Sequence, residues 1–392
     1  MSETVILAGA RTPIGKMSGG LTSFRGTELG ALAIRAALER SSVAPEQVDY
    51  VFMGQVLLAG EGQAPARQAA AAAGIPMTVP ATTVNKVCLS GINAVYLAHQ
   101  MIAAGDAEVV VAGGMESMTK APYLLTRARE GYRLGDGDLV DSMMHDGLFC
   151  AFDHCAMGTG TEKYAASSGL ERAPQDAFSA QSHHRAAAAA AAGLFDPELV
   201  SVEVPQRRGD PVAVSADEGV RADVSAESLG RLRPAFAESG RITAGNASQI
   251  SDGASALVMT SRARAEQLGV VPLGTYAGYA QVAGPDPSLL TQPSRAVRRA
   301  LDSAGLRLGD VDLFEINEAF AAVALASMAD LGIPDDVVNV NGGAIALGHP
   351  IGASGNRIVL TLLHELRRRG GGVGAAALCG GGGQGDALLV RV

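Results

Sequence analysis

Hydrophobic and polar residues follow one another along the chain in two recurring patterns. Apolar positions recur at helical spacing in 27–40 (TELGALAIRAALER) and in the alanine-rich segment 64–73 (APARQAAAAA), and an apolar run at 50–55 has the length of a strand. The segment 1–15 and the last residues, ALLVRV, also contain short apolar runs typical of strands. Strands that alternate with helices predict βαβ units, and therefore an α/β protein.

One order of features occurs twice in the chain. Residues 88–114 (CLSGINAVYLAHQMIAAGDAEVVVAGG) predict a glycine turn, a helix and then a strand that ends in Gly-Gly. Residues 348–383 repeat this order at nearly the same spacing (GHPIGASGNRIVLTLLHELRRRGGGVGAAALCGGGG). An internal repeat of this kind predicts two similar halves, each of which contributes one glycine-rich loop to a shared seam.

The region between the two repeats has a different character. Residues 119–249 are polar and irregular, apart from the run Ala186–Ala192, which we interpret as a helix with Gly193 as its C′ residue. We therefore expect three units: an N-terminal half of 1–118 plus 250–270, an inserted loop-rich lid of 119–249, and a C-terminal half of 271–392.

Composition and charge limit the possible partners. The chain has 392 residues, 47% of them hydrophobic, which is enough for two to three packed units. Its net charge of −9 disfavours nucleic acid and anionic membranes as partners, because both attract a basic surface. The N-terminal segment lacks the features of a signal peptide, and we expect no apolar stretch that approaches the length of a membrane span.

Cysteine and histidine supply the candidate chemistry. The chain has four cysteines without a CxxC pair, which predicts reduced thiols and a cytoplasmic location. Cys88 lies at a predicted helix start, Cys379 lies where an apolar run meets a glycine loop, and His349 lies between Gly348 and Pro350. Free backbone N–H groups at such junctions stabilise a thiolate or an oxyanion, so this set of residues indicates acyl transfer.

A metal site is a weaker alternative for another group of residues. His145, Cys150, His154 and Cys155 are close in sequence, but their spacing fits no familiar zinc pattern. We therefore predict no metal ligands.

Several blocks of sequence, in order along the whole chain, resemble the thiolase family. The resemblance implies the thiolase fold, with two similar α/β halves in a layered αβαβα arrangement and a lid inserted in the first half. It also implies a ping-pong Claisen condensation of two acetyl-CoA molecules to acetoacetyl-CoA and CoA, and the reverse thiolysis. The matching blocks are NKVCLSGINAV, VVAGGMESMTKAPY, RPAF, TAGNAS, SDGASA, EINEAFA, NVNGGAIALGHPIGASG and ALCGGGGQGDA.

The resemblance also implies a role for five residues. Cys88 would be the nucleophile that carries the acyl group, His349 would activate it, and Cys379 would move a proton to and from the α-carbon of acetyl-CoA. Asn317 would position a water in the oxyanion hole beside His349. The backbone N–H groups of Cys88 and Gly381 would form the second hole.

Further residues would bind coenzyme A, which is a substrate here, and no metal or organic cofactor is implied. One departure from the family is Ala156, which stands where well-known biosynthetic members have a histidine near the pantetheine arm. This departure leaves open a 3-ketoacyl-CoA thiolase with a broader chain-length range. By resemblance the coenzyme A contacts are Leu148, Met157, Arg221, Ser228, Phe236, Ala244, Ser248, Ala319 and Phe320.

Two other functions remain to be weighed against this one. A decarboxylating ketoacyl synthase would use Cys, His and Asn but would not need Cys379, and a non-catalytic relative would lack one of Cys88, His349 and Cys379. All three residues are present. The family resemblance also implies a homo-oligomer, either a tetramer or a dimer.

Overall fold

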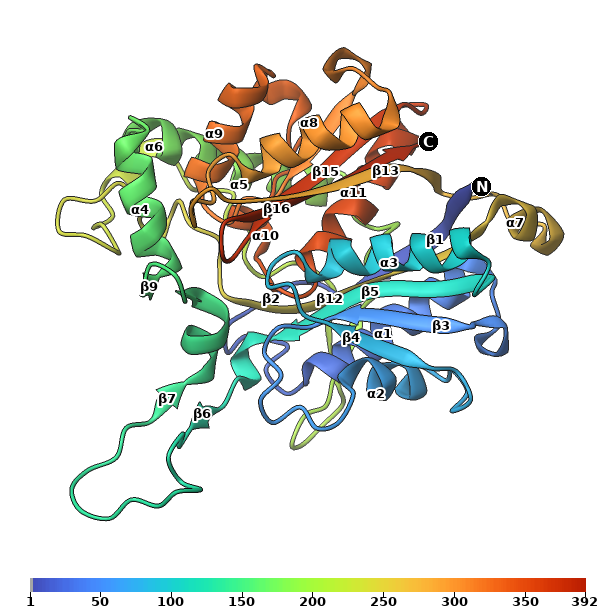
Figure 1. Cartoon of the computed structure of the whole chain (residues 1–392), viewed down its shortest axis with the longest axis horizontal. Coiled ribbons are helices and arrows are strands. Elements are labelled where there is room, and N and C mark those ends of the chain that lie inside the picture. The colour runs from blue at the N-terminus through green and yellow to red at the C-terminus, as the bar shows by residue number, and fades with distance from the viewer. Residues whose placement is uncertain (1–2) are drawn as a thin grey trace.

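The ten strands of the core form one continuous hydrogen-bonded series, which we divide into two mixed β-sheets where its pairing is shortest. The structure, a computed structural model, describes residues 3–392 (Figure 1). Its strands follow the order β14-β15-β16-β13-β1-β12-β5-β3-β4, with β2 beside β12. The pairing of β1 with β13 is limited to two residue pairs, Val5 with Thr275 and Ile6 with Gly274, so the strands divide into two sheets at this point.

The two sheets correspond to the two halves of the chain. β3 pairs in parallel with β4 and β5, and β14 pairs in parallel with β15, whereas the other main pairings are antiparallel. The first sheet contains β1 (Thr4–Arg11), β2 (Gly15–Lys16), β3 (Tyr50–Gly54), β4 (Ala81–Val84), β5 (Val109–Ser117) and β12 (Ser251–Ser261). The second contains β13 (Gly274–Ala283), β14 (Leu313–Ile316), β15 (Val373–Gly380) and β16 (Gln384–Arg391).

Helices cover both sheets and fill the space between them (Figure 1). α1 (Gly26–Ser41) and α2 (Pro65–Ala72) pack on the outer face of the first sheet, and α8 (Gln292–Ala304) and α9 (Ala321–Leu331) on the outer side of the second. α3 (Ser90–Ala104) and α11 (Ser354–Arg368) pack against each other between the sheets. Each of the three helical layers has its own apolar core, which confirms the predicted αβαβα arrangement.

The local elements follow the sequence pattern closely. The helices predicted at 27–40 and 64–73 are α1 and α2, and the run at 50–55 is β3. In α1 the apolar stripe Leu29, Ile34 and Leu38 is buried, which is why this amphipathic segment lies flat on the sheet. The last residues form β16, as predicted.

The two central helices meet at their N-termini, where neither has room for a side chain. A Cβ atom on Gly91 would lie 2.7 Å from the backbone nitrogen of Asn356, and one on Gly355 would lie 2.5 Å from that of Ile92. Glycine at the same place in both repeats therefore allows the backbones to touch. As a result, the positive ends of both helix dipoles point into the seam between the halves.

The segment between β5 and β12 lies outside these layers and is rich in loops. Its helices are α4 (Met157–Ser167), α5 (Arg172–Ala191) and α6 (Ala226–Gly230), and its strands form the short pairs β6–β7, β8–β9 and β10–β11. The alanine run lies in α5, and Gly193 follows its end with φ of +68°, as expected for a C′ glycine. The segment is fixed to the first sheet by buried Arg11, which pairs with Glu198 and Asp217.

The remaining elements are short connections. α7 (Arg262–Leu268) joins the two sheets and α10 (Ala344–Leu347) precedes the loop of His349. The strands of the segment 119–249 are β6 (Tyr123–Leu124), β7 (Val140–Asp141), β8 (Phe149–Cys150), β9 (Cys155–Ala156), β10 (Val202–Val204) and β11 (Val212–Val214).

One apolar segment is longer than the sequence led us to expect. Among residues 3–392, Val87–Ala104 is long and apolar enough to cross a membrane by length and composition, with a mean hydropathy of 1.3 over 18 residues. The prediction that no stretch approaches this length is therefore wrong for this segment. Its composition has a structural reason, because α3 packs against β3, β5 and α11 in the central layer.

Candidate active site

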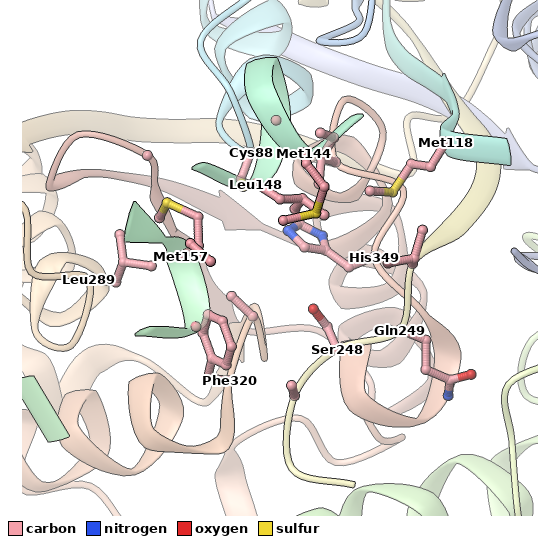
Figure 2. A pocket seen from close by; sticks show the side chains of 18 of the residues that line it. Cys88, Met118, Met144, Leu148, Met157, Ser248, Gln249, Leu289, Phe320 and His349 are labelled. Atoms are coloured by element: carbon pink, nitrogen blue, oxygen red, sulfur yellow. The ribbon is translucent and has the colours of Figure 1, made fainter. Parts of the chain in front are cut away.

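A cavity of about 530 Å³ lies at the seam between the halves and collects the predicted reactive groups. Cys88, His349, Cys379 and Gly381 all line it. Cys88 comes from the turn before α3, His349 from the loop before α11, and Cys379 from the end of β15. Figure 2 shows Cys88 and His349 in the wall of this cavity.

The backbone around Cys88 has an unusual conformation. Val87 has φ of +51°, a region that costs a β-branched residue about 1–3 kcal/mol. Hydrogen bonds close around the turn: Ser90 Oγ donates to the carbonyl of Val87 (2.6 Å), and the N–H of Val87 donates to Asn85 Oδ1 (3.1 Å). The sharp turn leaves Cys88 half-buried and facing the cavity, whereas Leu89 beside it is fully buried.

The thiols of Cys88 and Cys379 are both neutral at physiological pH. Burial raises the pKa of Cys88 to about 12 and the charge of Glu116 acts in the same direction, whereas the backbone N–H groups of Cys88 and Gly381 lower it. Burial also raises the pKa of Cys379, and the neighbouring Cys88 raises it further. The two N–H groups that favour a charged sulfur at Cys88 are those predicted for the oxyanion hole.

His349 has one ring nitrogen paired and one free. Its Nδ1 lies 2.6 Å from Ser354 Oγ, and Ser354 donates its own hydroxyl proton to the carbonyl of Pro350 (3.1 Å). The hydroxyl therefore accepts from Nδ1–H, which places the lone pair of the neutral ring on Nε2. Nε2 is buried and has no hydrogen-bond partner among residues 3–392.

The charge state of His349 follows from its surroundings. Burial lowers the pKa of His349 to about 3, and the nearby cation Arg357 acts in the same direction. The imidazole is therefore neutral at physiological pH. A neutral imidazole with a free Nε2 can accept a proton from a thiol.

Glu116, which the sequence analysis did not single out, holds the His349 loop in place. Its buried carboxylate accepts hydrogen bonds from the N–H groups of Val56 (2.9 Å), Leu57 (3.2 Å) and Gly352 (3.0 Å). Burial raises the pKa of Glu116 to about 8, although these three donors lower it. The end of β5 is thereby joined to the loop between His349 and α11.

Asn317 lies directly after β14 and does not line the cavity. Its backbone N–H donates to the carbonyl of Ala377 (2.9 Å), two residues before Cys379. Its side chain is buried, and neither Nδ2 nor Oδ1 has a partner within the described residues. A buried amide normally pairs both groups, so this side chain is available to a polar partner from outside the chain.

Seven of the nine predicted coenzyme A contacts line the cavity, and two do not. Arg221 is exposed, and both its backbone N–H and its Nη2 lie against His183. Ser228 is exposed in α6, where it exchanges hydrogen bonds with Ser225 as a helix cap. The seven residues in the wall are Leu148, Met157, Phe236, Ala244, Ser248, Ala319 and Phe320.

Most of the remaining wall is apolar, and its residues were not predicted from the sequence. Met118 and Met144 lie toward one side of the His349 ring in Figure 2, and Met157 and Leu289 toward the other. Ala156 and Ile351 also line the cavity. A mostly apolar wall with a few polar groups is typical of a small-molecule site.

The alternative metal group does not form a cluster. Within residues 3–392 no three His, Cys, Asp or Glu side chains are placed to hold a metal ion. Cys150 and Cys155 face each other across the β8–β9 pair, and His145 is exposed and pairs with Asp146.

Comparison with known proteins gives one consistent family. The thiolase N-terminal domain matches residues 4–263 and the thiolase C-terminal domain matches residues 270–392. A probable acetyl-CoA acetyltransferase of Mycolicibacterium smegmatis is 55% identical over 387 residues, which cover 99% of this chain and all of that protein. An acetyl-CoA acetyltransferase of Cupriavidus necator is 53% identical over 392 residues and the full length of both.

A solved structure agrees with the sequence comparisons. The crystal structure of the Bacillus anthracis acetyl-CoA acetyltransferase matches with a TM-score of 0.97 and 40% identity, over 100% of this chain and 99% of the other. The fold, the order of the blocks and the full-length relatives lead to the same conclusion. The chain belongs to the thiolase family of acyltransferases.

Proposed function

We propose that the protein is an acetyl-CoA C-acetyltransferase, which condenses two acetyl-CoA molecules to acetoacetyl-CoA and CoA and also catalyses the reverse thiolysis. The observation that carries the proposal is the single cavity that holds Cys88, Cys379 and the free Nε2 of His349. The names of the full-length relatives support the acetyl group as the acyl unit.

In the first half-reaction Cys88 takes the acetyl group. Its Sγ attacks the thioester carbonyl while Nε2 of His349 accepts the thiol proton, and the carbonyl oxygen gains negative charge. We assign the binding of this oxyanion to the N–H groups of Cys88 and Gly381, and the proposal is supported by the fact that both favour negative charge at Cys88. The C–S bond to coenzyme A then breaks as Cys379 gives its thiol proton to the leaving sulfur, so Cys379 becomes a thiolate and Nε2 keeps the proton of Cys88.

In the second half-reaction Cys379 acts as the base. Its thiolate removes a proton from the α-carbon of the second acetyl-CoA, and the resulting carbanion attacks the acyl carbon on Cys88. The new C–C bond forms as the bond to Cys88 breaks, and the Cys88 sulfur takes back the proton from Nε2 of His349, while Cys379 keeps the proton from the α-carbon. Burial raises the pKa of Cys379, which makes its thiolate a stronger base for a C–H proton.

The enolate of the second half-reaction needs its own hydrogen-bond donors. We assign this role to His349 and to a water held by Asn317. The buried side chain of Asn317, whose two polar atoms lack partners among residues 3–392, supports the assignment. The chain thus supplies nucleophile, base and oxyanion donors itself, and we propose that the chemistry requires no metal or organic cofactor.

Labelling with acetyl-CoA tests the first half-reaction. We expect mass spectrometry to find the acetyl group on the peptide of Cys88 and not on that of Cys379. An enzyme that turns over without a covalent adduct on either thiol would refute the mechanism.

Coenzyme A would enter past the apolar wall formed by Met157, Phe236 and Phe320. Arg221 and Ser228 lie outside the cavity, so a role for them at the nucleotide end stays a prediction. An exposed guanidinium suits a phosphate or an adenine ring.

A broader 3-ketoacyl-CoA thiolase is the second candidate. Ala156 in the wall and the methionines Met118 and Met144 favour it, because a small residue makes space and methionine adapts to different shapes. Thiolysis rates of acetoacetyl-CoA and a medium-chain 3-oxoacyl-CoA decide between the two. Equal rates would overturn the acetyl-specific proposal.

We also propose the division into 1–118 plus 250–270, 119–249 and 271–392. The division is supported by the path of the chain, which leaves the first sheet after β5 and comes back to it at β12. β12 lies between β1 and β5, and 133 residues separate β5 from β12 in the sequence. Limited proteolysis of the native enzyme should cut within 119–249 first, and early cuts in β12 or β15 would contradict the division.

A projecting arm supports the proposal of a homo-oligomer. β6 and β7 carry the loop 125–139 away from the body of the molecule (Figure 1). Leu134 on this loop is fully exposed and Leu139 is 63% exposed. Exposed apolar residues on an arm are typical of a contact with a second copy of the chain. We expect Leu134→Asp with Leu139→Asp to lower the assembly state in light scattering, and an unchanged mass would contradict this.

The cytoplasm is the proposed location, and we propose neither a nucleic acid nor a membrane as a partner. All four cysteines are free, in agreement with a reducing compartment. The net charge of −9 supports the absence of a nucleic acid partner.

A further inference from the structure

An ion pair that has no role in the proposed reaction joins the strained turn of Cys88 to the C-terminal half. Lys86 Nζ lies 2.7 and 2.9 Å from the two carboxylate oxygens of Asp386 and 2.8 Å from Gln281 Oε1. Asp386 is fully buried on β16, and Lys86 is half-buried. Three hundred positions separate the two residues in the sequence, so the pair joins one half to the other.

The other flank of Cys88 reaches the same carboxylate. Asn93, in the second turn of α3, donates to the hydroxyl of Tyr279 (3.1 Å), and Tyr279 donates to Asp386. Burial and the charge of Asp386 raise the pKa of Tyr279, so the phenol keeps its proton and remains the donor. Residues before and after Cys88 are therefore held by one carboxylate.

Asp386 itself lies on β16, the strand that pairs with the strand of the second thiol. In the β15–β16 pairing Asp386 faces Leu378 and Gly385 faces Cys379. The contact with the Cys88 turn is close here: a Cβ atom on Gly380 would lie 2.6 Å from Leu89, and one on Gly381 would lie 3.3 Å from Val87. The side chains on both sides of Cys88 thus pack on the two glycines that follow Cys379.

From this arrangement we infer that Lys86 and Asp386 are positioning residues, whose ion pair holds the Cys88 turn against Gly380 and Gly381. The sulfur of Cys88 then stays within reach of the Gly381 N–H and of Cys379. The inference rests on the proposed function, in which these groups act on one substrate.

Stability alone does not account for such a pair. Removing a lysine and a carboxylate from water is unfavourable, and well-packed apolar residues often replace buried ion pairs without loss of stability. A buried, fully hydrogen-bonded carboxylate fixes the distance between the Cys88 turn and β16, which an apolar contact does not.

The test uses Lys86→Met, Asp386→Asn, the double variant and Lys86→Arg in the full-length enzyme. Lys120→Met, at an exposed lysine, is the matched control. Each protein is assayed at the same interval below its own melting temperature, so that a loss of folding does not appear as a loss of rate. Three quantities are measured: kcat and KM for thiolysis of acetoacetyl-CoA, the single-turnover rate of acetylation at Cys88, and the rate of Cys88 alkylation by iodoacetamide, which needs no oxyanion hole.

For Lys86→Met we expect kcat and the acetylation rate to fall about 10- to 100-fold, with KM and alkylation within about threefold, because misplacement by 1 Å has effects of this size. Lys86→Arg should recover part of the loss. The double variant should be no worse than Lys86→Met, since both changes remove one interaction. Lys120→Met should match the parent enzyme.

Three results would overturn the inference. The first is a kcat of Lys86→Met and of Asp386→Asn within about twofold of the parent value. The second is a loss of kcat in the double variant equal to the product of the two single losses. The third is a fall in the alkylation rate as large as the fall in the acetylation rate. If the parent enzyme itself is not acetylated at Cys88, the proposed function fails. Normal acetylation in both the parent and Lys86→Met would reject the positioning role alone.

Discussion

The turn before α3 and the loop before α11 occupy equivalent places in the two halves, yet they are held in different ways. The first turn contains Val87 at φ of +51° and is fixed by contacts from the other half. The second has the imidazole of His349 bonded within its own loop to Ser354, and the loop is anchored by Glu116. The repeat brings two helix N-termini to one seam. The different loops before them give one the proposed nucleophile, Cys88, and the other the imidazole proposed to activate it, His349.

Removal of each thiol should give the largest effects. We expect Cys88→Ser to lower thiolysis about 10⁴-fold or more and to abolish the acyl-enzyme, because a serine hydroxyl is far less acidic than a thiol. Cys379→Ser should still become acetylated but should fail in the carbon–carbon step. Mass spectrometry of the acetyl adduct together with steady-state rates separates the two, and acetylation of the Cys88→Ser protein at Cys379 would reverse the assignment.

The contact between the helix N-termini predicts the next largest effect. Gly355→Ala places a methyl group against the backbone of Ile92, and we expect a loss of about 2–3 kcal/mol in the free energy of unfolding. Gly309→Ala is the control, since a Cβ atom there would meet nothing within 4 Å and φ is not positive. Urea denaturation measures both variants, and equal midpoints would show that the helices do not meet as described.

The layered fold could be predicted because it depends on local patterns. Helical spacing in 27–40, the apolar run at 50–55 and the repeat of turn, helix and strand all have a local physical cause, and each formed as expected. Cys88, His349 and Cys379 were found because their residue types and glycine neighbours are unusual. The internal repeat of turn, helix and strand was enough to predict that these residues meet at the seam between the two halves.

The residues that hold the site in place could not be predicted in this way. Lys86 and Asp386 are far apart in the sequence, and Glu116 acts on backbone groups from two other segments. Asn317 was predicted through the family resemblance alone, and only the structure shows that its side chain is buried without partners among residues 3–392. Ser354 could have been suspected from the sequence, because a serine at a helix start five residues after a histidine can reach the histidine ring. Serines at helix starts usually serve as caps, however, so the pattern alone does not single it out.

Ser354 provides a sharper test of how the His349 loop works. Ser354→Ala removes the acceptor that keeps the proton on Nδ1, and we expect kcat to fall about tenfold with KM little changed, because a general base contributes only in the correct tautomer. Ser327→Ala is the matched control, as this buried serine donates to the carbonyl of Leu290, and neither residue lines the cavity. A loss of similar size in both variants would mean that Ser354 acts through packing alone.

The burial of His349 also predicts a dependence of stability on pH. The unfolded chain binds a proton at this imidazole below about pH 6.5, whereas burial lowers the pKa of the folded protein to about 3. Between these values the unfolded state holds the extra proton, so the free energy of unfolding rises with pH by up to about 1.4 kcal/mol per unit. The contribution is complete above pH 6.5 and is lost as the pH falls toward 3.

His349→Asn should therefore show a shallower slope than the parent in urea titrations from pH 4.5 to 7, while the other histidines contribute equally to both proteins. Parallel slopes would mean that His349 titrates in the folded protein as it does in water, and the Cys88 proton would then be taken by an imidazole with ordinary basicity.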